Sequence, residues 1–551
     1  MANTDSNDSE LGVRDGAAEI LDAVIIGAGF SGLYQLHRLR DHLGLNVQVL
    51  EVAPAIGGTW YWNRYPGARC DSLSHSYRFM FSEALASGWE SSERYPGPEE
   101  NCRYLTYVAE QLDLQENIRL NIRVEWAHYD EQAGLWSIGT DVGVTYKARY
   151  FITAVGCLSS TNVPDIPGLE RFAGDWYHTG AWPHAGVDFA GKRVGQIGTG
   201  SSGIQAAPVI AETANHLTVF QRTANYSVPA HNGPLSAEFQ QYVRENFSQI
   251  REIMRSSPNG MPFPLSERLA VDTAPDEREA IFERAWQVGG LQFRSSFFDL
   301  MVDEDANATA AEFIKNKIRA TVENPETAKI LTDIDHPYGT KRPPVDSFYF
   351  ETFNQDHADL VDLRATPILE VTPTGIRTTE QEYPLDIIVL ATGFDAMTGA
   401  LLKMDIRGRA GQSLADAWVA GPTNYLGLQV AGFPNMFTIT GPGSPSVLSN
   451  MPVAIEQHVD WITDCIEHLE RNQVVAIEAS EGAMDEWVAH VNDLANATLM
   501  PKANHSWYHG ANVPGKPVVF MPYAGGIVRF RATCNEVAQD GYRGFELQYR
   551  T

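Results

Sequence analysis

The chain has 551 residues, of which 44% are hydrophobic, 10% aromatic and 20% charged. One hydrophobic core seldom serves more than about 250–300 residues, so two or three domains are expected. The formal net charge of −28 argues against nucleic acids and anionic membranes as partners, because both require a basic face. We therefore expect a small-molecule substrate, no nucleic acid and no membrane.

The cysteines and the apolar runs indicate a protein of the reducing cytoplasm. No signal-peptide pattern opens the chain, and no apolar run reaches the ~18 residues of a membrane span. The five cysteines are widely spaced and include no Cys-x-x-Cys pair: Cys70, Cys102, Cys157, Cys465 and Cys534. Neither a disulfide framework nor a metal site is predicted.

A dinucleotide-binding pattern follows a polar N-terminal segment. Residues 1–19 are rich in Asn, Asp, Ser and Glu, so they are predicted to be disordered. Residues 21–26 form an apolar strand that leads into a glycine-rich turn and an amphipathic helix. The glycines of the turn allow a tight bend, a close approach to a pyrophosphate and close helix packing; they are Gly27, Gly29 and Gly32. The next strand, residues 47–50, ends in Glu51, which can bind ribose hydroxyls.

The same pattern recurs later in the chain. A strand over residues 193–197 precedes a second glycine-rich turn, a helix to about residue 211 and a strand over residues 217–220. The second turn consists of Gly198, Thr199, Gly200, Ser201, Ser202 and Gly203. The repeat predicts a second nucleotide-binding domain in the same chain.

The residue at the end of each pattern distinguishes the two sites. Glu51 follows Gly27 by 24 positions (51 − 27), and Arg222 stands at the same offset from Gly198 (222 − 198). A carboxylate would repel a ribose 2′-phosphate, whereas Arg222 can form charge-assisted hydrogen bonds with one. The second site is therefore predicted to bind NADPH, which leaves the first for a flavin.

Two unlike nucleotide sites indicate a flavoprotein in which NADPH supplies hydride. The electron relay of disulfide reductases needs a pair of thiols, which this sequence lacks, so oxygen is the expected electron acceptor. The apolar runs 151–156 and 387–394 are interpreted as strands, each returning the chain to a nucleotide domain. From these residues alone, oxygenation of N or S atoms and insertion beside a carbonyl both remain open.

Two longer motifs carry a resemblance to a known family. Phe172-Ala-Gly174-Asp-Trp-Tyr-His178-Thr-Gly-Ala-Trp182-Pro183 matches the F-x-G-x-x-x-H-x-x-x-W-P fingerprint of type I Baeyer–Villiger monooxygenases. Gly57-Gly58-Thr59-Trp60, Tyr65-Pro66-Gly67 and Asp71 match their second signature. From about residue 20 onward the chain resembles this family, most closely its phenylacetone, steroid and cyclohexanone monooxygenases.

The resemblance implies an activity and two cofactors. With FAD and NADPH, the enzyme would convert ketones to esters or lactones with dioxygen through a C4a-peroxyflavin, and it would also oxidise sulfides. The alternative is an N- or S-oxygenating flavin-containing monooxygenase. A non-catalytic NADPH-binding or redox-sensing protein is a third hypothesis, which a yellow colour and ketone-stimulated NADPH oxidation would exclude.

The resemblance also assigns roles to single residues. Arg342 is implied to face the flavin as the main catalytic residue, and Asp71 to orient it. Lys341 is implied to meet the 2′-phosphate, and Trp507 to close over the nicotinamide side. His178 is implied to act in a hinge motion.

Further residues complete these candidate sets. The cofactor-binding set also includes Thr59, Trp60, Asp71, Tyr77 and Thr223. The hinge motif consists of Phe172, Gly174, His178 and Trp182. The loop over residues 441–451 resembles the substrate-pocket loop of the family, with Ser444, Leu448 and Met451 as its candidates.

The predicted fold class is α/β, with two Rossmann-like domains and a helical insertion. The FAD-binding domain would comprise residues 20–150 and 386–551, and the NADPH-binding domain 151–225 and 336–385. Residues 226–335 carry helix signals, namely an amphipathic stretch over 236–255, a start at Pro275 and a start at Asn324-Pro325. A monomer or weak homo-oligomer is expected.

Overall fold

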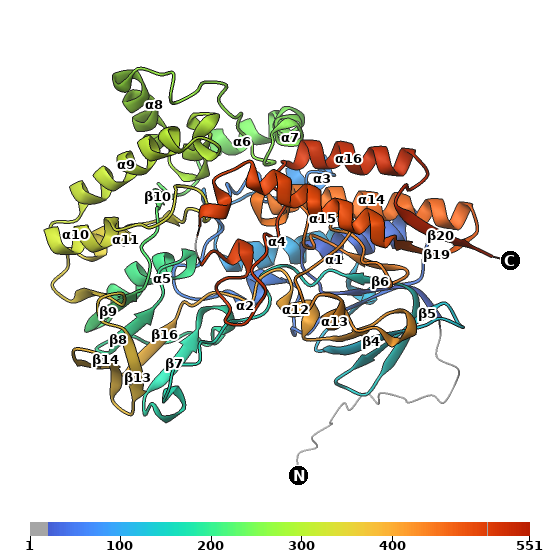
Figure 1. Cartoon of the computed structure of the whole chain (residues 1–551), viewed down its shortest axis with the longest axis horizontal. Helices are drawn as coiled ribbons and strands as arrows, with labels where there is room; N and C mark the ends of the chain where they lie inside the picture. The colour runs from blue at the N-terminus through green and yellow to red at the C-terminus, as the bar shows by residue number, and fades with distance from the viewer. Residues whose placement is uncertain (1–19, 504, 551) are drawn as a thin grey trace, which may run out of the picture.

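The structure, a computed structural model, describes residues 20–503 and 505–550. The predicted disordered segment 1–19 lies outside the described residues. Two largely parallel sheets stand side by side, and helices cover them (Figure 1). This arrangement confirms the predicted α/β fold class.

The first sheet contains the first glycine-rich pattern. Its eight strands are β17 (Asp405–Arg407), β4 (Val124–Asp130), β5 (Leu135–Thr140), β6 (Thr145–Thr153), β1 (Ile20–Ile26), β2 (Val47–Leu50) and β3 (Ile118–Arg119) in spatial order, with β18 (Met436–Thr438) also paired to β6. β1 pairs in parallel with β2 and β6. Ala23, Val24 and Ile25 are fully buried, because side chains cover both faces of the strand.

The second sheet contains the second pattern and is parallel throughout. Its spatial order is β12 (Ala358–Asp362), β9 (His216–Gln221), β8 (Arg193–Ile197), β16 (Ile387–Leu390) and β7 (Asp175–His178). Helix α5 (Ser201–Ala211) follows the second glycine-rich turn. Strands β2 and β8 and the end of α5 lie where the sequence predicts them.

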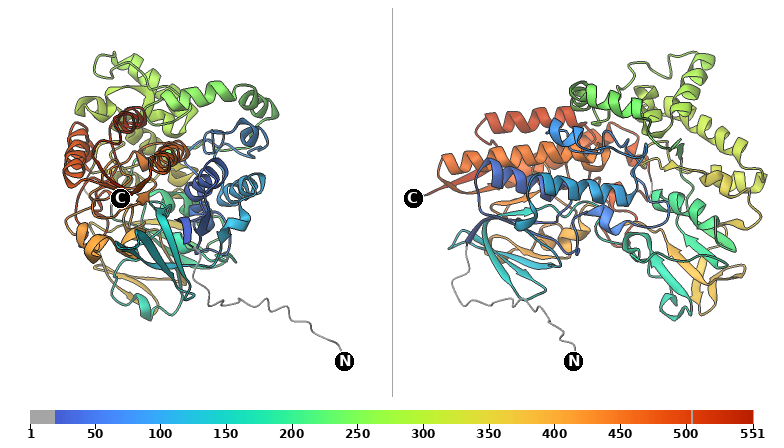
Figure 2. Two further views of the ribbon diagram at one scale, coloured as in Figure 1. Left: turned by 90° about the vertical axis from the view of Figure 1, so that its right-hand side faces the viewer. Right: turned by 180° about the vertical axis from the view of Figure 1, so that it is seen from behind.

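Late helices of the chain pack on the early ones above the first sheet. The early helices are α1 (Phe30–His37), extended by a π-helical turn (Arg38–His42), and α4 (Pro98–Gln111). The late helices are α14 (Met451–Arg471), α15 (Glu481–Asn496) and α16 (Ile527–Gln539). The right-hand view of Figure 2 shows the orange and red helices above the blue ones. The Tyr34 hydroxyl donates to Asp460 at 2.7 Å, which joins α1 to α14. The two ends of the chain thus share one core.

The predicted helical insertion contains helices that lie across the top and down the left side of the molecule in Figure 1. They are α6 (Ala237–Glu245), α7 (Phe247–Ser256), α8 (Pro275–Val288), α9 (Glu304–Thr321) and α10 (Pro325–Thr332). The three predicted helix signals are confirmed: Pro275 and Pro325 occupy first turns, and Ser236 caps α6. Strands β10 (Val228–Pro229) and β11 (Val345–Asp346) pair with each other, one before and one after these helices in the sequence.

Two predicted domain boundaries differ from the sheets. Strand β6 continues past residue 150, because Phe151 to Thr153 pair with β1 and β18. Strand β16, predicted to begin the second part of the FAD-binding domain, instead lies in the second sheet between β7 and β8. A buried apolar run can complete either sheet equally well, so the sequence could not distinguish them.

Shorter elements connect these parts. They are β13 (Ile368–Thr372), β14 (Gly375–Thr378), β15 (Glu382–Pro384), β19 (Val474–Ala479), β20 (Phe545–Tyr549), α2 (Thr59–Trp62), α3 (Glu83–Ser87), α11 (Tyr349–Thr352), α12 (Gly399–Leu402) and α13 (Leu414–Ala417). Within residues 20–503 and 505–550, no helix combines the length and apolarity needed to cross a membrane.

Candidate active site

The first glycine-rich turn joins β1 to α1 through unusually close backbone contacts. At Gly27 the backbone φ is +106°, and a Cβ atom there would lie 2.6 Å from the carbonyl oxygen of Ala154. A Cβ at Gly32 would lie 1.8 Å from the carbonyl oxygen of Gly27, so only glycine lets α1 start here. A Cβ at Gly29 would lie 3.3 Å from Gly58. The turn therefore presents bare backbone at a helix N-terminus, as a pyrophosphate requires.

Glu51, at the end of β2, is held by the same turn. One carboxylate oxygen accepts a hydrogen bond from the Ala28 N–H at 2.6 Å, and the other accepts from the Ala53 N–H at 2.8 Å. The residue is only 4% exposed, and burial raises the pKa of its carboxyl despite these hydrogen bonds. The Val52 N–H also hydrogen-bonds this carboxylate, which has about four lone-pair sites, so the predicted binding of a ribose hydroxyl stays chemically possible.

The other candidates for the first cofactor lie near the start of α1. The Trp60 indole N–H donates to the Tyr77 hydroxyl at 3.2 Å, and their rings meet edge-on. The Tyr77 ring also meets Phe30 edge-on, with centroids 5.2 Å apart. Thr59 is exposed at the start of α2. Three separate segments thus converge beside the first glycine-rich turn.

The second glycine-rich turn repeats this geometry at the carboxyl end of β8, the central strand of the second sheet. Gly198 has a φ of +107°, and a Cβ there would lie 2.4 Å from the carbonyl oxygen of Ala391. A Cβ at Gly203 would lie 2.2 Å from the carbonyl oxygen of Gly198, whereas Gly200 faces open space. The Thr199 hydroxyl donates to the Thr223 carbonyl at 2.9 Å. Ser201 and Ser202 begin α5, with their N–H groups at its N-terminus.

Two cations lie beyond this turn. Arg222 is exposed at the end of β9, and Lys341 is half-buried. Burial lowers the pKa of Lys341, the charge of Asp335 raises it, and the charge of Arg222 lowers it further. The two cations therefore influence each other electrostatically, although 119 positions separate them (341 − 222). Within the described residues neither cation forms an ion pair.

Arg342 is fixed by three hydrogen bonds. Its Nε and Nη2 atoms donate to the two carboxylate oxygens of Asp71, the latter at 2.8 Å. Its Nη1 atom donates to the carbonyl oxygen of Val447 at 2.7 Å. Burial would lower the pKa of Arg342, but the attraction and hydrogen bonds of Asp71 raise it above its ordinary value. The guanidinium is thus a permanently charged, oriented group at the junction of three chain segments.

The predicted substrate loop supplies the carbonyl group that holds Arg342. Val447 lies in a 3₁₀ turn (Ser446–Leu448), and Leu448 and Met451 pack in the apolar cluster that also contains Trp507. Ser444 is fully buried, and its hydroxyl donates to the Gly441 carbonyl at 2.6 Å. Ser444 therefore shapes the loop, whereas Leu448 and Met451 face the cluster beside Arg342.

The segment that carries Trp507 is tied to the strand end after β16. Lys516 donates to the carboxylate of Asp395 at 2.5 Å and to the carbonyl oxygen of Ala396 at 2.8 Å. Asn512 donates to the carbonyl oxygen of Phe394 at 2.8 Å. These contacts hold residues 506–520 against the site, and sequence motifs alone did not reveal them.

The hinge motif lies at the edge of the second sheet, on β7. A Cβ at Gly174 would lie 2.3 Å from the carbonyl oxygen of Asp386, so β7 packs tightly against the approach to β16. His178 is 3% exposed, and its Nδ1 atom accepts from the Gly180 N–H at 3.0 Å. Trp182 is buried, and Phe172 packs in the apolar cluster of this sheet. The motif therefore packs within the second sheet, and the His178 ring also meets Phe394 edge-on, with centroids 6.2 Å apart.

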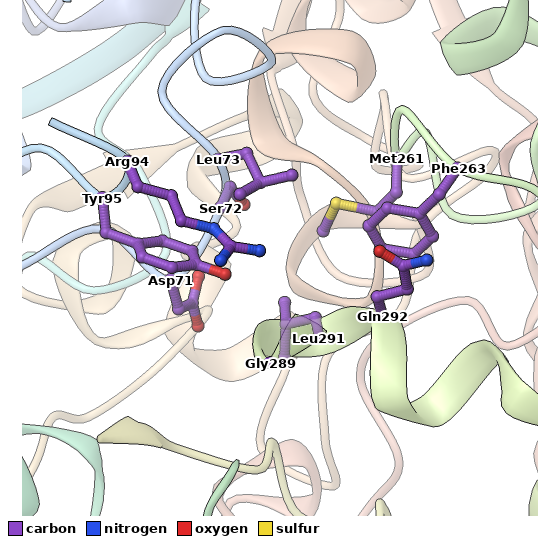
Figure 3. Close-up of a pocket in the computed structure, with 10 residues that line it drawn as sticks. All are labelled: Asp71, Ser72, Leu73, Arg94, Tyr95, Met261, Phe263, Gly289, Leu291 and Gln292. Carbon is purple, nitrogen blue, oxygen red and sulfur yellow. The ribbon is translucent and has the colours of Figure 1, made fainter. Parts of the chain in front are cut away.

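Figure 3 shows a pocket that adjoins the Arg342–Asp71 pair. Its lining comprises Asp71, Ser72, Leu73, Arg94, Tyr95, Met261, Phe263, Gly289, Leu291 and Gln292. Only Asp71 among these was a candidate from sequence. The others come from loops and from the helical segment, so no local pattern joins them.

Comparisons with known proteins agree with this geometry. Residues 24–257 match the family model described as pyridine nucleotide-disulphide oxidoreductase. The chain is 44% identical to a Baeyer–Villiger monooxygenase of Pseudooceanicola batsensis, over 95% of each chain. It is similar to the structure of an oxidised steroid monooxygenase bound to NADP, with 47% identity and a TM-score of 0.92 over 97% of this chain and 100% of that one. It is also similar to OTEMO in complex with FAD and NADP, with 39% identity and a TM-score of 0.93 over the same shares.

Proposed function

The chain belongs to the Baeyer–Villiger monooxygenases, and we propose that Arg342, held by Asp71, is the catalytic cation of its reaction. The enzyme uses FAD and NADPH to convert ketones to esters or lactones. The observation that carries the proposal is the guanidinium fork, which both oxygens of Asp71 and the Val447 carbonyl hold in one orientation.

The residues present fit the two cofactors. The two glycine-rich turns place bare backbone at helix N-termini, where a Cβ atom would meet neighbouring carbonyl oxygens. We assign FAD to the first turn with Glu51, and NADPH to the second turn with Arg222 and Lys341. When bound, FAD supplies the activation of dioxygen and NADPH supplies the hydride.

Arg342 would act on charge that develops at the reacting atoms. As the ketone is attacked, its carbonyl oxygen gains negative charge, which a fixed guanidinium stabilises without reorganisation. Asp71 keeps the guanidinium in place, so it is a positioning residue. Trp507 and its tethered segment would exclude water from the same space.

A product assay tests this function. Cyclic, aryl and steroid ketones are incubated with NADPH and ¹⁸O₂, and esters are identified by mass spectrometry. We expect one labelled oxygen atom in the ester and NADPH oxidation that depends on ketone. Sulfoxides or N-oxides from test sulfides and amines, with no ester from any ketone, would instead support the N- or S-oxygenating alternative.

Finer assignments belong to the same proposal. We assign dioxygen as the second substrate and the cytoplasm as the location, since the five cysteines are free and four of them are buried. The FAD-binding domain would keep the first sheet, and the NADPH-binding domain the second sheet with β16. A monomer or weak homo-oligomer is proposed, which light scattering would test.

A further inference from the structure

A second arginine approaches Arg342 from the helical insertion. Arg294 belongs to the 3₁₀ segment after α8 (Gly290–Ser296), and this segment and Asp71 line the same pocket (Figure 3). A Cβ atom at Gly339 would lie 3.9 Å from the Cδ atom of Arg294. The stem of Arg294 therefore passes beside the turn that leads into Arg342.

The charges in this region confirm that the two arginines are close. Burial lowers the pKa of the Arg294 guanidinium, two nearby phenols raise it, and the charge of Arg342 lowers it further. Tyr508 is one of these phenols and lies near both arginines. Burial raises the pKa of Tyr508, the charges of Arg342 and Arg294 lower it, and its hydroxyl hydrogen-bonds Arg342. Because a guanidinium stays protonated in proteins, two positive charges meet here.

The two arginines differ in their counter-ions. Both oxygens of Asp71 accept from Arg342, so this carboxylate neutralises that cation. Within residues 20–503 and 505–550, Arg294 forms no ion pair and no side-chain hydrogen bond, and no carboxylate is among the charges that influence its pKa. Opposite charges that lie together largely cancel at a distance, whereas a lone charge does not. The net positive charge of this region is therefore that of Arg294.

The setting of Arg294 is costly for a charge. Burial has the largest influence on its pKa, yet its side chain keeps some exposed surface, as does that of Arg342 at 21%. Such a group lies deep in the protein without being completely enclosed. Removing a cation from bulk water without a partner costs free energy. Ionisable groups in such surroundings are typical of functional sites.

We propose that Arg294 supplies the net positive charge of the active site and stabilises the negative charge that develops on the ketone oxygen. The proposal rests on the function assigned above and adds a second cation to it. Arg342, held by Asp71, provides directed hydrogen bonds. Arg294 provides an attraction that Asp71 does not cancel, and it needs no reorganisation during the reaction.

Two substitutions separate the charge of Arg294 from its shape. Arg294→Met removes the charge and keeps a long side chain, whereas Arg294→Lys keeps the charge. We expect Arg294→Met to slow ester formation by roughly 10–100-fold, which a unit charge about 6–12 Å away provides at an effective dielectric constant of about 20. Arg294→Lys should retain most of the parent rate. The KM for NADPH should stay near the parent value in both variants.

The midpoint potential of the bound FAD provides a readout without turnover. Net positive charge near a flavin favours its electron-rich reduced form, so Arg294→Met should shift the potential to a more negative value and Arg294→Lys should leave it near that of the parent. Arg284, exposed on α8, gives a matched control, because Arg284→Met removes the same charge from the neighbouring helix. It should change neither the ester rate nor the potential. FAD absorbance reports whether each variant folds.

The outcomes distinguish the inference from the function. An Arg294→Met enzyme with the parent ester rate would overturn the inference and leave the function intact. Equal losses in Arg294→Met and Arg294→Lys would also overturn it, because shape and not charge would then matter. A raised KM for NADPH with an unchanged ester rate would assign Arg294 to the nucleotide instead. A parent that forms no ester would contradict the function, and the midpoint potentials would still judge the charge of Arg294.

Discussion

Arg342 and Lys341 are neighbours in the sequence but belong to two regions that hold their cations differently. Asp71 and Val447 fix Arg342 through three hydrogen bonds. Lys341 and Arg222 form no ion pair within the described residues, and the charge of Arg222 lowers the pKa of Lys341. A cation that stabilises charge in a transition state is more effective when its position is fixed before the reaction, because no reorganisation is then needed. Cations that recognise a phosphate gain from keeping their donors free for it.

The largest expected effect comes from removing the fixed cation. Arg342→Ala should bind FAD and accept hydride from NADPH but lose ester formation by roughly 10²–10³-fold or more. Stopped-flow reduction of the flavin and ester analysis measure the two halves separately. Ester formation near the parent rate would show that the held guanidinium is structural.

Removing Asp71, which orients Arg342, should lower ester formation by a smaller factor. Asp71→Ala removes the two hydrogen bonds that orient Arg342 and leaves those to the Val447 carbonyl and the Tyr508 hydroxyl, and misorientation can cost up to about 10²-fold. Asp71→Asn should recover part of the rate, because the amide oxygen can still accept from the guanidinium. Turnover close to the parent value in Asp71→Ala would show that Arg342 does not need to be held by Asp71 in order to act.

The free cations should affect cofactor choice and not chemistry. Arg222→Ala or Lys341→Ala should raise the KM for NADPH by roughly 10–150-fold, the loss of one charge-assisted contact, with little change for NADH. Paired cofactor titrations at fixed ketone measure this. Equal effects on both cofactors would place the cations at the shared pyrophosphate, and a parent that prefers NADH would refute the NADPH assignment.

The smallest expected effect is a shift with pH. Lys341 is charged below its pKa, so its phosphate contact is present at low pH and lost as pH rises through that pKa. Burial and the charge of Arg222 lower the pKa, which brings this loss to a lower pH than for an ordinary lysine. Arg222→Ala should therefore move the rise in KM for NADPH to higher pH. An unmoved profile would show that the two cations act independently.

The sequence was informative where the chemistry is local. Strand, turn and terminal charge lie within about one βαβ unit, so both nucleotide sites and the contrast between Glu51 and Arg222 were predictable. Arg342 and Asp71 were identified only through the family resemblance, because 271 positions separate them. The Val447 carbonyl could not be found at all, since any residue type carries a backbone carbonyl.

The sequence could not show which side chains and which strands pair with each other in the fold. The hydrogen bonds of Arg342 depend on Asp71 and Val447 lying beside it, which only the fold reveals. The assignment of β16 to the wrong sheet has a related cause. A run of buried aliphatic residues specifies a strand but not its neighbours, which the packing of the whole chain selects.

The position of β16 also has a consequence for synthesis of the protein. It lies between β8 and β7, yet Ile387 follows Arg193 by 194 positions (387 − 193). As the chain leaves the ribosome, β7 and β8 emerge long before the strand that joins them, so their edges stay unpaired meanwhile. The first sheet waits still longer for β18. Neither sheet can pair all its strands until most of the chain has been synthesised. The yield of folded protein in a cell should therefore depend on chaperones that shield the unpaired strand edges.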